Sequence, residues 1–363
     1  MSQDQKDRGW RAHWKAFTIG AVFAVLAAWA GSELLTTVPA EAKAAGLRTE
    51  VHVGELDDYY GFFSGGHSGE VRVLGVPSMR VLKRIPVFNL DPATGWGITN
   101  ESKALLGDYT IGDTHHAHAS YTDGTYDGKY LWVNDKANNR LARIDIRYLE
   151  VDKIITIPHT QGTHGTFPQR YPSSEWLIMN SEFRTPVIND GTGDMRDETL
   201  YGGVHTVIDA EEMEVVCQLT TPVNLDLAAT DYGGKYSFAT SYNSEGGATI
   251  SEMLAKDRDY LVVFNWDRIK AELKNGNYKV VDGVKMLDGS PGTDLALYIP
   301  VAKNPHGVNI TPDGKYAICS GKVSPTATLI SIDKLADAFD GKIEPKDCIV
   351  GNPEIGLGPL HTT

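Results

Sequence analysis

Short hydrophobic runs rich in β-formers alternate with turns along most of the chain, and helical periodicity is scarce. Each run follows a tight-turn signal, and typical runs are Leu131–Asn134, Trp176–Met179, Ser237–Thr240 and Ala317–Ser320. Helical patterns occur only near Glu252–Lys256, Arg268–Leu273 and Leu335–Phe339. The pattern predicts an all-β protein.

Four near-copies of one turn divide the chain into repeating units. Residues 127–130 and 313–316 read Asp-Gly-Lys-Tyr, residues 233–236 read Gly-Gly-Lys-Tyr, and residues 173–176 are a looser copy. The copies lie 46, 60 and 80 residues apart, as expected for blade-sized units with insertions. Because radial repetition protects sheet edges, these units and N-terminal strands over 51–88 predict a β-propeller of four to five blades. A β-sandwich or β-solenoid is the alternative.

Residues 1–44 have the pattern of a secretory signal peptide. An apolar run of sixteen residues follows four basic side chains and precedes a small-residue stretch, with cleavage expected after Ala42 or Ala44. An uncleaved membrane anchor is the alternative, for which the run is slightly short. We therefore expect a partial propeller domain over 45–363. The chain looks interrupted, because Gly356–Thr363 has neither a helix stop nor a polar tail.

Charge and cysteine content exclude two kinds of function. A net charge of −13 and the absence of any Lys/Arg run argue against a nucleic-acid partner. The three cysteines, Cys217, Cys319 and Cys348, are widely spread with no Cys-x-x-Cys pair. We expect buried thiols, or one disulfide and one thiol, rather than a metal site.

Several histidines occupy the same place in successive units. His306 lies ten residues before the tyrosine of its turn, and His164 lies twelve before the tryptophan of its turn. The pair His115 and His116 precedes the turn of an earlier unit, and His361 resembles the opening of another repeat. Equivalent positions in propeller blades are related by rotation about the axis, so these side chains are expected to converge at one end of the channel.

A set of imidazoles without thiolate favours copper, and zinc next, because neutral nitrogen donors suit these metals. A zinc ion usually has three or four protein ligands. Five histidines exceed that number and therefore predict a multinuclear copper site. The competing interpretation is that each histidine only forms a hydrogen bond with a backbone carbonyl. This interpretation is weaker for five histidines at equivalent positions of the repeat than for a single histidine. We find no acidic residue in register with the five, which argues against a zinc or calcium hydrolase.

Polar residues beside the five histidines have less specific expectations. Asp113, two residues before the pair, either accepts an imidazole N–H and fixes the tautomer of a ligand, or caps a turn. His118 is expected beside the ligands, on the same strand face as His116. The histidines out of register are expected at the surface or in strands: His52, His67, His159 and His205.

The motifs closely resemble those of the nitrous-oxide reductases. They include Gly112-Asp-Thr-His-His-Ala-His, Val133-Asn-Asp-Lys-Ala-Asn, Thr240-Ser-Tyr-Asn-Ser-Glu, Asn304-Pro-His-Gly and Gly356-Leu-Gly-Pro-Leu-His. The resemblance covers residues 50–363 with the motifs in order.

The resemblance implies a seven-bladed propeller that holds CuZ, a four-copper, sulfide-bridged centre with seven histidine ligands, followed by a cupredoxin domain that holds CuA. Five ligands match His115, His116, His164, His306 and His361. The other two ligands and the cupredoxin domain would lie beyond Thr363, so we expect this polypeptide alone to be inactive. The implied reaction is reduction of nitrous oxide to dinitrogen and water, the last step of denitrification. Electrons would come from a small cytochrome c or cupredoxin, through CuA of the partner subunit in a homodimer.

The resemblance also implies a calcium site. The matching positions are Tyr242, Glu245, Met253 through its carbonyl, Asp259 and Asn304. Carboxylate and carbonyl oxygens are the ligands that Ca²⁺ prefers. Without the resemblance, Glu245 and Asp259 would be interpreted as ordinary solvent-exposed acidic residues.

The implied compartment is the periplasm. Many relatives carry a twin-arginine signal, whereas here Arg8 and Arg11 are separated by Gly-Trp, which indicates either export by the general secretory route or a wrongly assigned N-terminus. The alternative function is a non-catalytic periplasmic propeller that binds a ligand or partner protein, and it predicts no copper.

Overall fold

The computed structural model describes residues 50–186, 192–194, 197–242, 249–256 and 259–361. The expected signal peptide over 1–44 lies outside these residues. The chain divides into two compact units, the first made of residues up to Gly61 with Leu74–Arg80 and the second of Phe62–Val73 with Val81–Thr363. In the first unit, the buried Asp57 carboxylate accepts a hydrogen bond from Nε of Arg80 at 2.8 Å.

An N-terminal sheet precedes the repeats. It has the strand order β1 (Tyr59–Ser64), β2 (Glu70–Val76) and β3 (Val81–Pro86). Helix α3 (Asn100–Leu106) follows it and begins where the Thr99 side chain accepts a hydrogen bond from the backbone N–H of Ser102. Such a cap satisfies one free N–H of the first helical turn.

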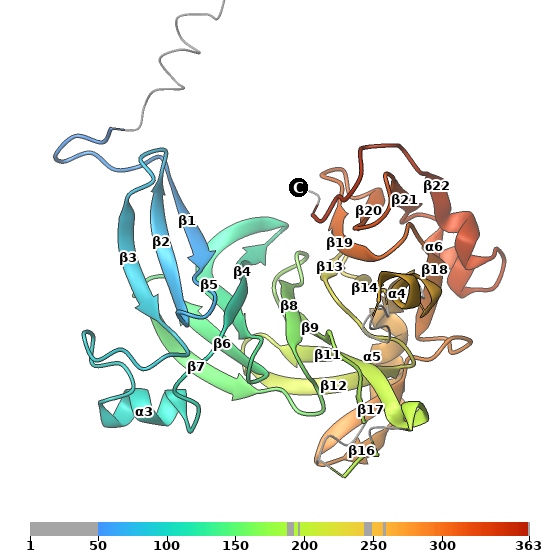
Figure 1. Cartoon of the computed structure of the whole chain (residues 1–363), viewed down its shortest axis with the longest axis horizontal. Helices are drawn as coiled ribbons and strands as arrows, with labels where there is room; N and C mark the ends of the chain where they lie inside the picture. Colours follow the sequence, from blue (N-terminus) through green and yellow to red (C-terminus); the bar gives the residue numbers. More distant parts are fainter. Residues whose placement is uncertain (1–49, 187–191, 195–196, 243–248, 257–258, 362–363) are drawn as a thin grey trace, which may run out of the picture. The chain divides into compact units, whose positions relative to one another are not determined.

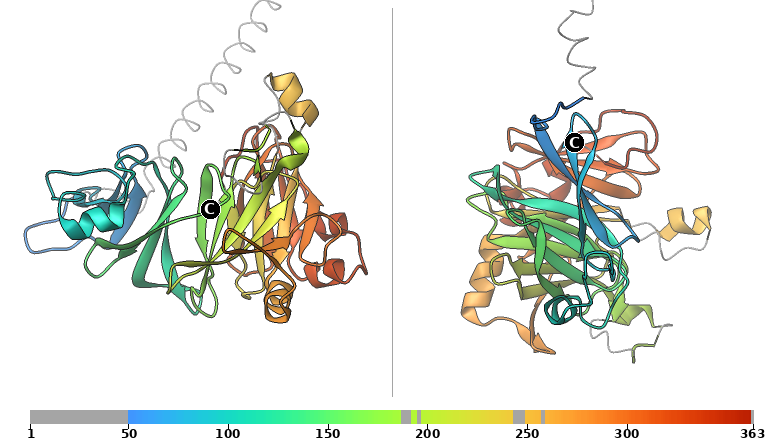
Figure 2. Two further views of the ribbon diagram at one scale, coloured as in Figure 1. Left: turned by 90° about the horizontal axis from the view of Figure 1, so that it is seen from below. Right: turned by 90° about the vertical axis from the view of Figure 1, so that its left-hand side faces the viewer.

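Four consecutive sheets make up most of the second unit (Figures 1 and 2). The first comprises β4 (Thr114–Thr122), β5 (Thr125–Asp135), β6 (Arg140–Asp145) and β7 (Glu150–Thr156). The second comprises β8 (Thr163–Pro168), β9 (Trp176–Ser181), β11 (Tyr201–Asp209) and β12 (Glu214–Thr221), with β10 (Thr185–Pro186) paired to β11. The third comprises β13 (Ala228–Thr230), β14 (Tyr236–Ser241), β15 (Tyr260–Asn265) and β18 (Ala296–Pro300). The fourth comprises β19 (Pro305–Ile310), β20 (Tyr316–Gly321), β21 (Ala327–Ser331) and β22 (Ile349–Gly351).

These sheets are propeller blades, and the all-β propeller expected from the repeats is confirmed. Strand order within each follows chain order from the inside outward. The repeated turn lies between the first and second strands of the second, third and fourth blades, and at the start of β5 in the first. The sequence repeat therefore marks the second strand of each blade.

Helical segments are insertions between strands. The chain also contains α4 (Ile250–Lys256), α5 (Trp266–Asn275), α6 (Leu335–Phe339), β16 (Lys279–Val281) and β17 (Val284–Asp288). The β16–β17 hairpin leaves the third blade and joins the second, where β17 pairs in parallel with β12. Within the described residues, no helix is both long and apolar enough to span a membrane.

Hydrophobic side chains fill the spaces between neighbouring blades. Val207 and Leu219 of the second blade pack with Val262 and Phe264 of the third in one buried cluster. Strands β6 and β14 are buried along their whole length, because a sheet between two others is covered on both faces. The cysteines contribute to this packing, and all three are buried free thiols as the sequence predicted.

Candidate metal centre

The first strands of the first, second and fourth blades carry four of the five histidines. Strands β4, β8, β13 and β19 follow one another side by side on the inner side of the blades. His115 and His116 lie at the start of β4, His164 at the start of β8, and His306 at the start of β19. The register seen in the sequence therefore places these side chains at one end of the inner strands.

A pairing irregularity accompanies the histidines in all three strands. The register shifts between His115 and Ala117 in β4, between His164 and Thr166 in β8, and across His306 in β19. A β-bulge adds one residue, bends its strand and redirects side chains, and bulges often lie beside functional sites. A bulge at the equivalent position of each strand explains why the histidine side chains converge instead of pointing to alternate faces of the sheets.

The five histidines form one cluster. The Nε2 atoms of His116 and His164 are 2.8 Å apart, and ring nitrogens of His115, His116 and His164 lie within 4.8 Å of one another. The His306 ring lies 5.8 Å from that of His164 and 4.9 Å from that of His361. The structure thus brings together all five residues that the sequence singled out.

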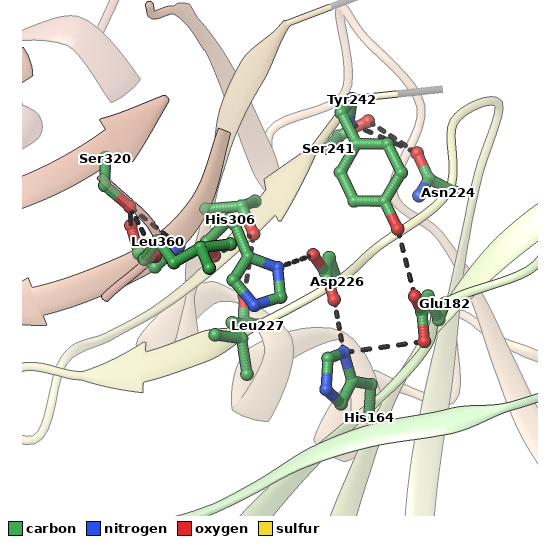
Figure 3. A network of polar contacts seen from close by, with 12 residues as sticks. His164, Glu182, Asn224, Asp226, Leu227, Ser241, Tyr242, His306, Ser320 and Leu360 are labelled. Atoms are coloured by element: carbon green, nitrogen blue, oxygen red, sulfur yellow. Dashed lines mark hydrogen bonds and ion pairs between the residues drawn. The ribbon is translucent and has the colours of Figure 1, made fainter. Parts of the chain in front are cut away.

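A buried carboxylate holds two of the histidines (Figure 3). Nδ1 of His164 contacts Oδ1 of Asp226, and Nδ1 of His306 contacts Oδ2 of the same side chain. Asp226 is fully buried, and the segment that carries it is fixed by hydrogen bonds from its backbone N–H to the Thr240 carbonyl and from Asn180 Nδ2 to its own carbonyl. With each Nδ1–H donated to the carboxylate, each Nε2 keeps its lone pair for another partner.

Asp226 corrects one expectation from the sequence, that no acidic residue stands in register with the histidines. It lies ten residues before Tyr236, as His306 lies ten before Tyr316. A pattern defined by histidines alone does not include an aspartate at the equivalent position. Its carboxylate accepts from the outer Nδ1 atoms, so it orients imidazoles instead of joining their nitrogens.

Burial favours the neutral form of three of these imidazoles, those of His115, His116 and His361. It lowers the pKa of His115 to about 4, with the nearby His164 ring as the next cause, and it lowers the pKa of His116 and His361 as well. Burial alone would raise the pKa of Asp226, but the hydrogen bonds from His164 and His306 outweigh it and hold that pKa below its ordinary value. Neutral imidazoles beside an ionised carboxylate are in the protonation state that metal ligation requires.

Glu182 extends the network and was not predicted. Its Oε2 lies 3.6 Å from His164 Nδ1 and forms an ion pair with Lys136, while its Oε1 accepts a hydrogen bond from the Tyr242 hydroxyl at 3.0 Å. His164, Glu182 and Asp226 could geometrically form a second cation site. The Lys136 ammonium already neutralises Glu182, so we interpret this group as support for His164.

The segment that carries His361 is docked through its backbone. The Leu360 carbonyl accepts hydrogen bonds from the Gly307 N–H at 2.8 Å and the Ser320 hydroxyl at 2.7 Å. A Cβ at Gly307 would come within 2.5 Å of that carbonyl oxygen and 2.9 Å of the His361 Cα, so only glycine permits the approach. His361 therefore reaches the cluster although its side chain is exposed.

The remaining histidine and aspartate candidates take varied positions. Asp113 lies 4.0 Å from the exposed His67, and its backbone N–H donates to Asp135. His118 is half-buried on β4 beside the ligands, with its ring 4.4 Å from that of Phe167. His205 is fully buried in β11 between Asn180 and Ser237. His52 lies at the surface, and His159 lies in a buried turn.

Three of the five calcium candidates have described side chains. Asp259 Oδ1 accepts from the backbone N–H of Asn304 at 2.7 Å, and its Oδ2 pairs with Lys303 at 3.0 Å. Tyr242 is buried and bonds Glu182. Glu245 lies outside the described residues, as does the side chain of Met253, whose backbone lies in α4. Asp259 and Asn304 are thus neighbours, and the set as a whole remains a prediction.

Comparison with known proteins finds similarity to one enzyme family. The family model "Nitrous oxide reductase propeller repeat 2" matches residues 157–227, which include His164 and Asp226. The nitrous-oxide reductase of Pseudomonas fluorescens is 50% identical over 356 residues, which are 95% of this chain and 56% of that protein. The enzyme of Stutzerimonas stutzeri is 51% identical over 329 residues, 87% of this chain and 51% of that protein. This chain is a relative of the nitrous-oxide reductases.

The chain spans about half the length of the curated nitrous-oxide reductases that it matches. A solved structure, the hydrazine synthase of Kuenenia stuttgartiensis, is similar with a TM-score of 0.55 at 16% identity, covering 83% of this chain and 73% of that one. At this identity the likeness shows the fold alone.

Proposed function

We propose that this chain supplies five histidine ligands of a multinuclear copper centre of the CuZ type, at which nitrous oxide is reduced to dinitrogen and water. The observation that carries the proposal is the convergence of five imidazoles, two of which are oriented through Nδ1 by Asp226. The identity of 46–51% to nitrous-oxide reductases supports it.

The donor set fits copper. All five side chains offer imidazole nitrogen, and the described thiols are buried in packing clusters. Nitrogen donors without carboxylate at the centre suit copper better than calcium or magnesium. When bound, the copper centre supplies the two electrons that nitrous oxide accepts together with two protons.

The chain's own residues would bind the metal and orient the ligand side chains. His164 and His306 would direct Nε2 inward because Asp226 takes both Nδ1–H groups, and His115, His116 and His361 complete this part of the shell. The resemblance implies seven ligands, five of which match residues of this chain. We further propose Ca²⁺ at the Tyr242, Glu245, Met253, Asp259 and Asn304 positions, a periplasmic location, and a homodimer that receives electrons from a small cytochrome c or cupredoxin.

Metal analysis of the full chain purified from copper-fed cells tests the proposal. We expect more than one copper per chain, with a marked loss in His116→Ala and His306→Ala. His67→Ala is the matched control, because His67 is exposed and outside the cluster. A chain that retains no copper, or whose copper content is unchanged by both cluster variants, would instead be the non-catalytic propeller.

A further inference from the structure

A second polar site lies at the opposite end of the same inner strands. In β4, His115 lies near the start of the strand and Tyr121 near its end, and β8 together with the two residues after it carries the chain from His164 to Arg170. Six residues of extended chain span about 20 Å. The far ends of the strands therefore lie well away from the histidine cluster.

An open cavity of about 520 Å³ lies at this far end. Its lining comes from all four blades and includes Tyr121, Tyr126, Arg170, Tyr232, Ile310 and Ile318. Small-molecule sites are typically concave and mostly apolar, with a few polar groups that fix orientation. Aromatic rings and aliphatic side chains around one guanidinium have this composition.

Arg170 is held in place without neutralisation. Its Nη1 donates a 2.6 Å hydrogen bond to the Tyr232 hydroxyl, and its guanidinium lies 4.8 Å from the Tyr232 ring and 5.6 Å from the Tyr121 ring. Within the described residues, no carboxylate forms an ion pair with it. The nearby acid Asp231 is occupied, since its oxygens accept three backbone N–H groups of the β13–β14 turn.

Three other arginines, all in the first blade, provide a comparison. Arg140, Arg143 and Arg147 also lie near aromatic rings, and each forms an ion pair with an aspartate. A half-buried, rigidly held guanidinium without a carboxylate is uncommon in a chain with a net charge of −13. Guanidinium and carboxylate match in a planar, two-bonded geometry.

We propose that the cavity around Arg170 is a binding site for a small organic carboxylate, with the carboxylate on the guanidinium and an apolar or aromatic body against Tyr121, Tyr232 and Ile310. The ligand would contact all four blades and stabilise their arrangement. The site is independent of copper, so the proposal does not rest on the proposed function.

Calorimetric titration of the full metal-free chain with benzoate tests the proposal, with benzamide as the uncharged analogue. We expect benzoate to bind, benzamide to bind about tenfold or more weakly, and Arg170→Gln to weaken benzoate by a similar factor. Arg147→Gln is the matched control, because Arg147 lies over Tyr148 but pairs with Asp145. It should leave the benzoate affinity unchanged.

A second variant keeps the test decisive if Arg170→Gln fails to fold. Ile318→Trp starts from a half-buried side chain of the cavity wall, fills the cavity and leaves the guanidinium in place, so it should abolish benzoate binding. Equal affinity for benzoate and benzamide, equal affinity for chloride, or benzoate binding that survives both variants would overturn the proposal.

Discussion

Asp226 and His306 occupy equivalent positions in neighbouring blades, and the first accepts the hydrogen bond that orients the second. The same position of the repeat thus carries a candidate metal ligand in one blade and the carboxylate that orients this ligand in the neighbouring blade. Because Asp226 also accepts from His164, one carboxylate governs imidazoles from two other blades.

Asp226→Asn should weaken copper binding by about 10- to 100-fold, since losing a ligand's hydrogen-bond partner typically has this effect. An amide offers one oxygen and one NH₂ group, so one of the two histidines must change tautomer. Competition with a chelator measures the affinity. Asp231→Asn is the control, because this buried acid caps a turn at the other end of the blade, and it should lower stability without altering copper affinity. Equal copper affinities in the two variants would refute the role of Asp226.

Gly307→Ala should reduce copper content while the fold persists. The added Cβ would displace the Leu360 carbonyl and the backbone of His361, so one ligand leaves the cluster. Metal analysis and circular dichroism together check this. Gly351→Ala is the matched control in the same blade, where the new Cβ would lie 4.0 Å from its nearest neighbour, Pro353. Unchanged copper content in Gly307→Ala would contradict the docking of His361 described above.

Asp135→Asn should destabilise the fold by about 3–5 kcal/mol, because it leaves the buried Arg140 without its counter-charge. Arg140 Nε lies 2.7 Å from Asp135 Oδ2, and both residues are almost fully buried. Urea unfolding measures the change. Arg147→Gln removes an ion pair whose arginine is exposed to solvent, and should cost less than about 1 kcal/mol. Similar losses in the two variants would show that burial does not matter for this pair.

Stability should depend on pH through His205. Burial lowers its pKa to about 3, whereas the unfolded side chain titrates near 6.5. Below pH 6.5 the unfolded state therefore binds a proton that the folded state does not, and stability falls as the pH drops from about 6.5 toward 3.

Comparison with His205→Gln isolates this contribution. The variant should lose stability less steeply over that window, by up to about 1.4 kcal/mol per pH unit. Glutamine keeps a donor for Asn180 and an acceptor for Ser237, so both chains can be followed by urea unfolding at several pH values. Parallel pH profiles would exclude His205 as the source.

The sequence predicted the blades because their turns repeat, and it predicted the five histidines because they share one position relative to those turns. It did not predict α3, whose start depends on the short Thr99 cap rather than on hydrophobic periodicity. His205 lies in a strand, one of the two places expected for it, but its environment depends on a stacking partner 59 residues away, Phe264, which the sequence did not indicate. Glu182 has no spacing signal, since its contact with His164 exists only once β8 and β9 pair.

The third blade donates no imidazole, yet one of its carboxylates, that of Asp226, contacts ligands from the second and fourth blades. A rotation of those blades against each other would have to break two charge-assisted hydrogen bonds in a buried place. Conformational entropy that would otherwise be lost when an ion binds is therefore lost during folding. Affinity for the ion is then determined largely by the folded protein before the ion arrives.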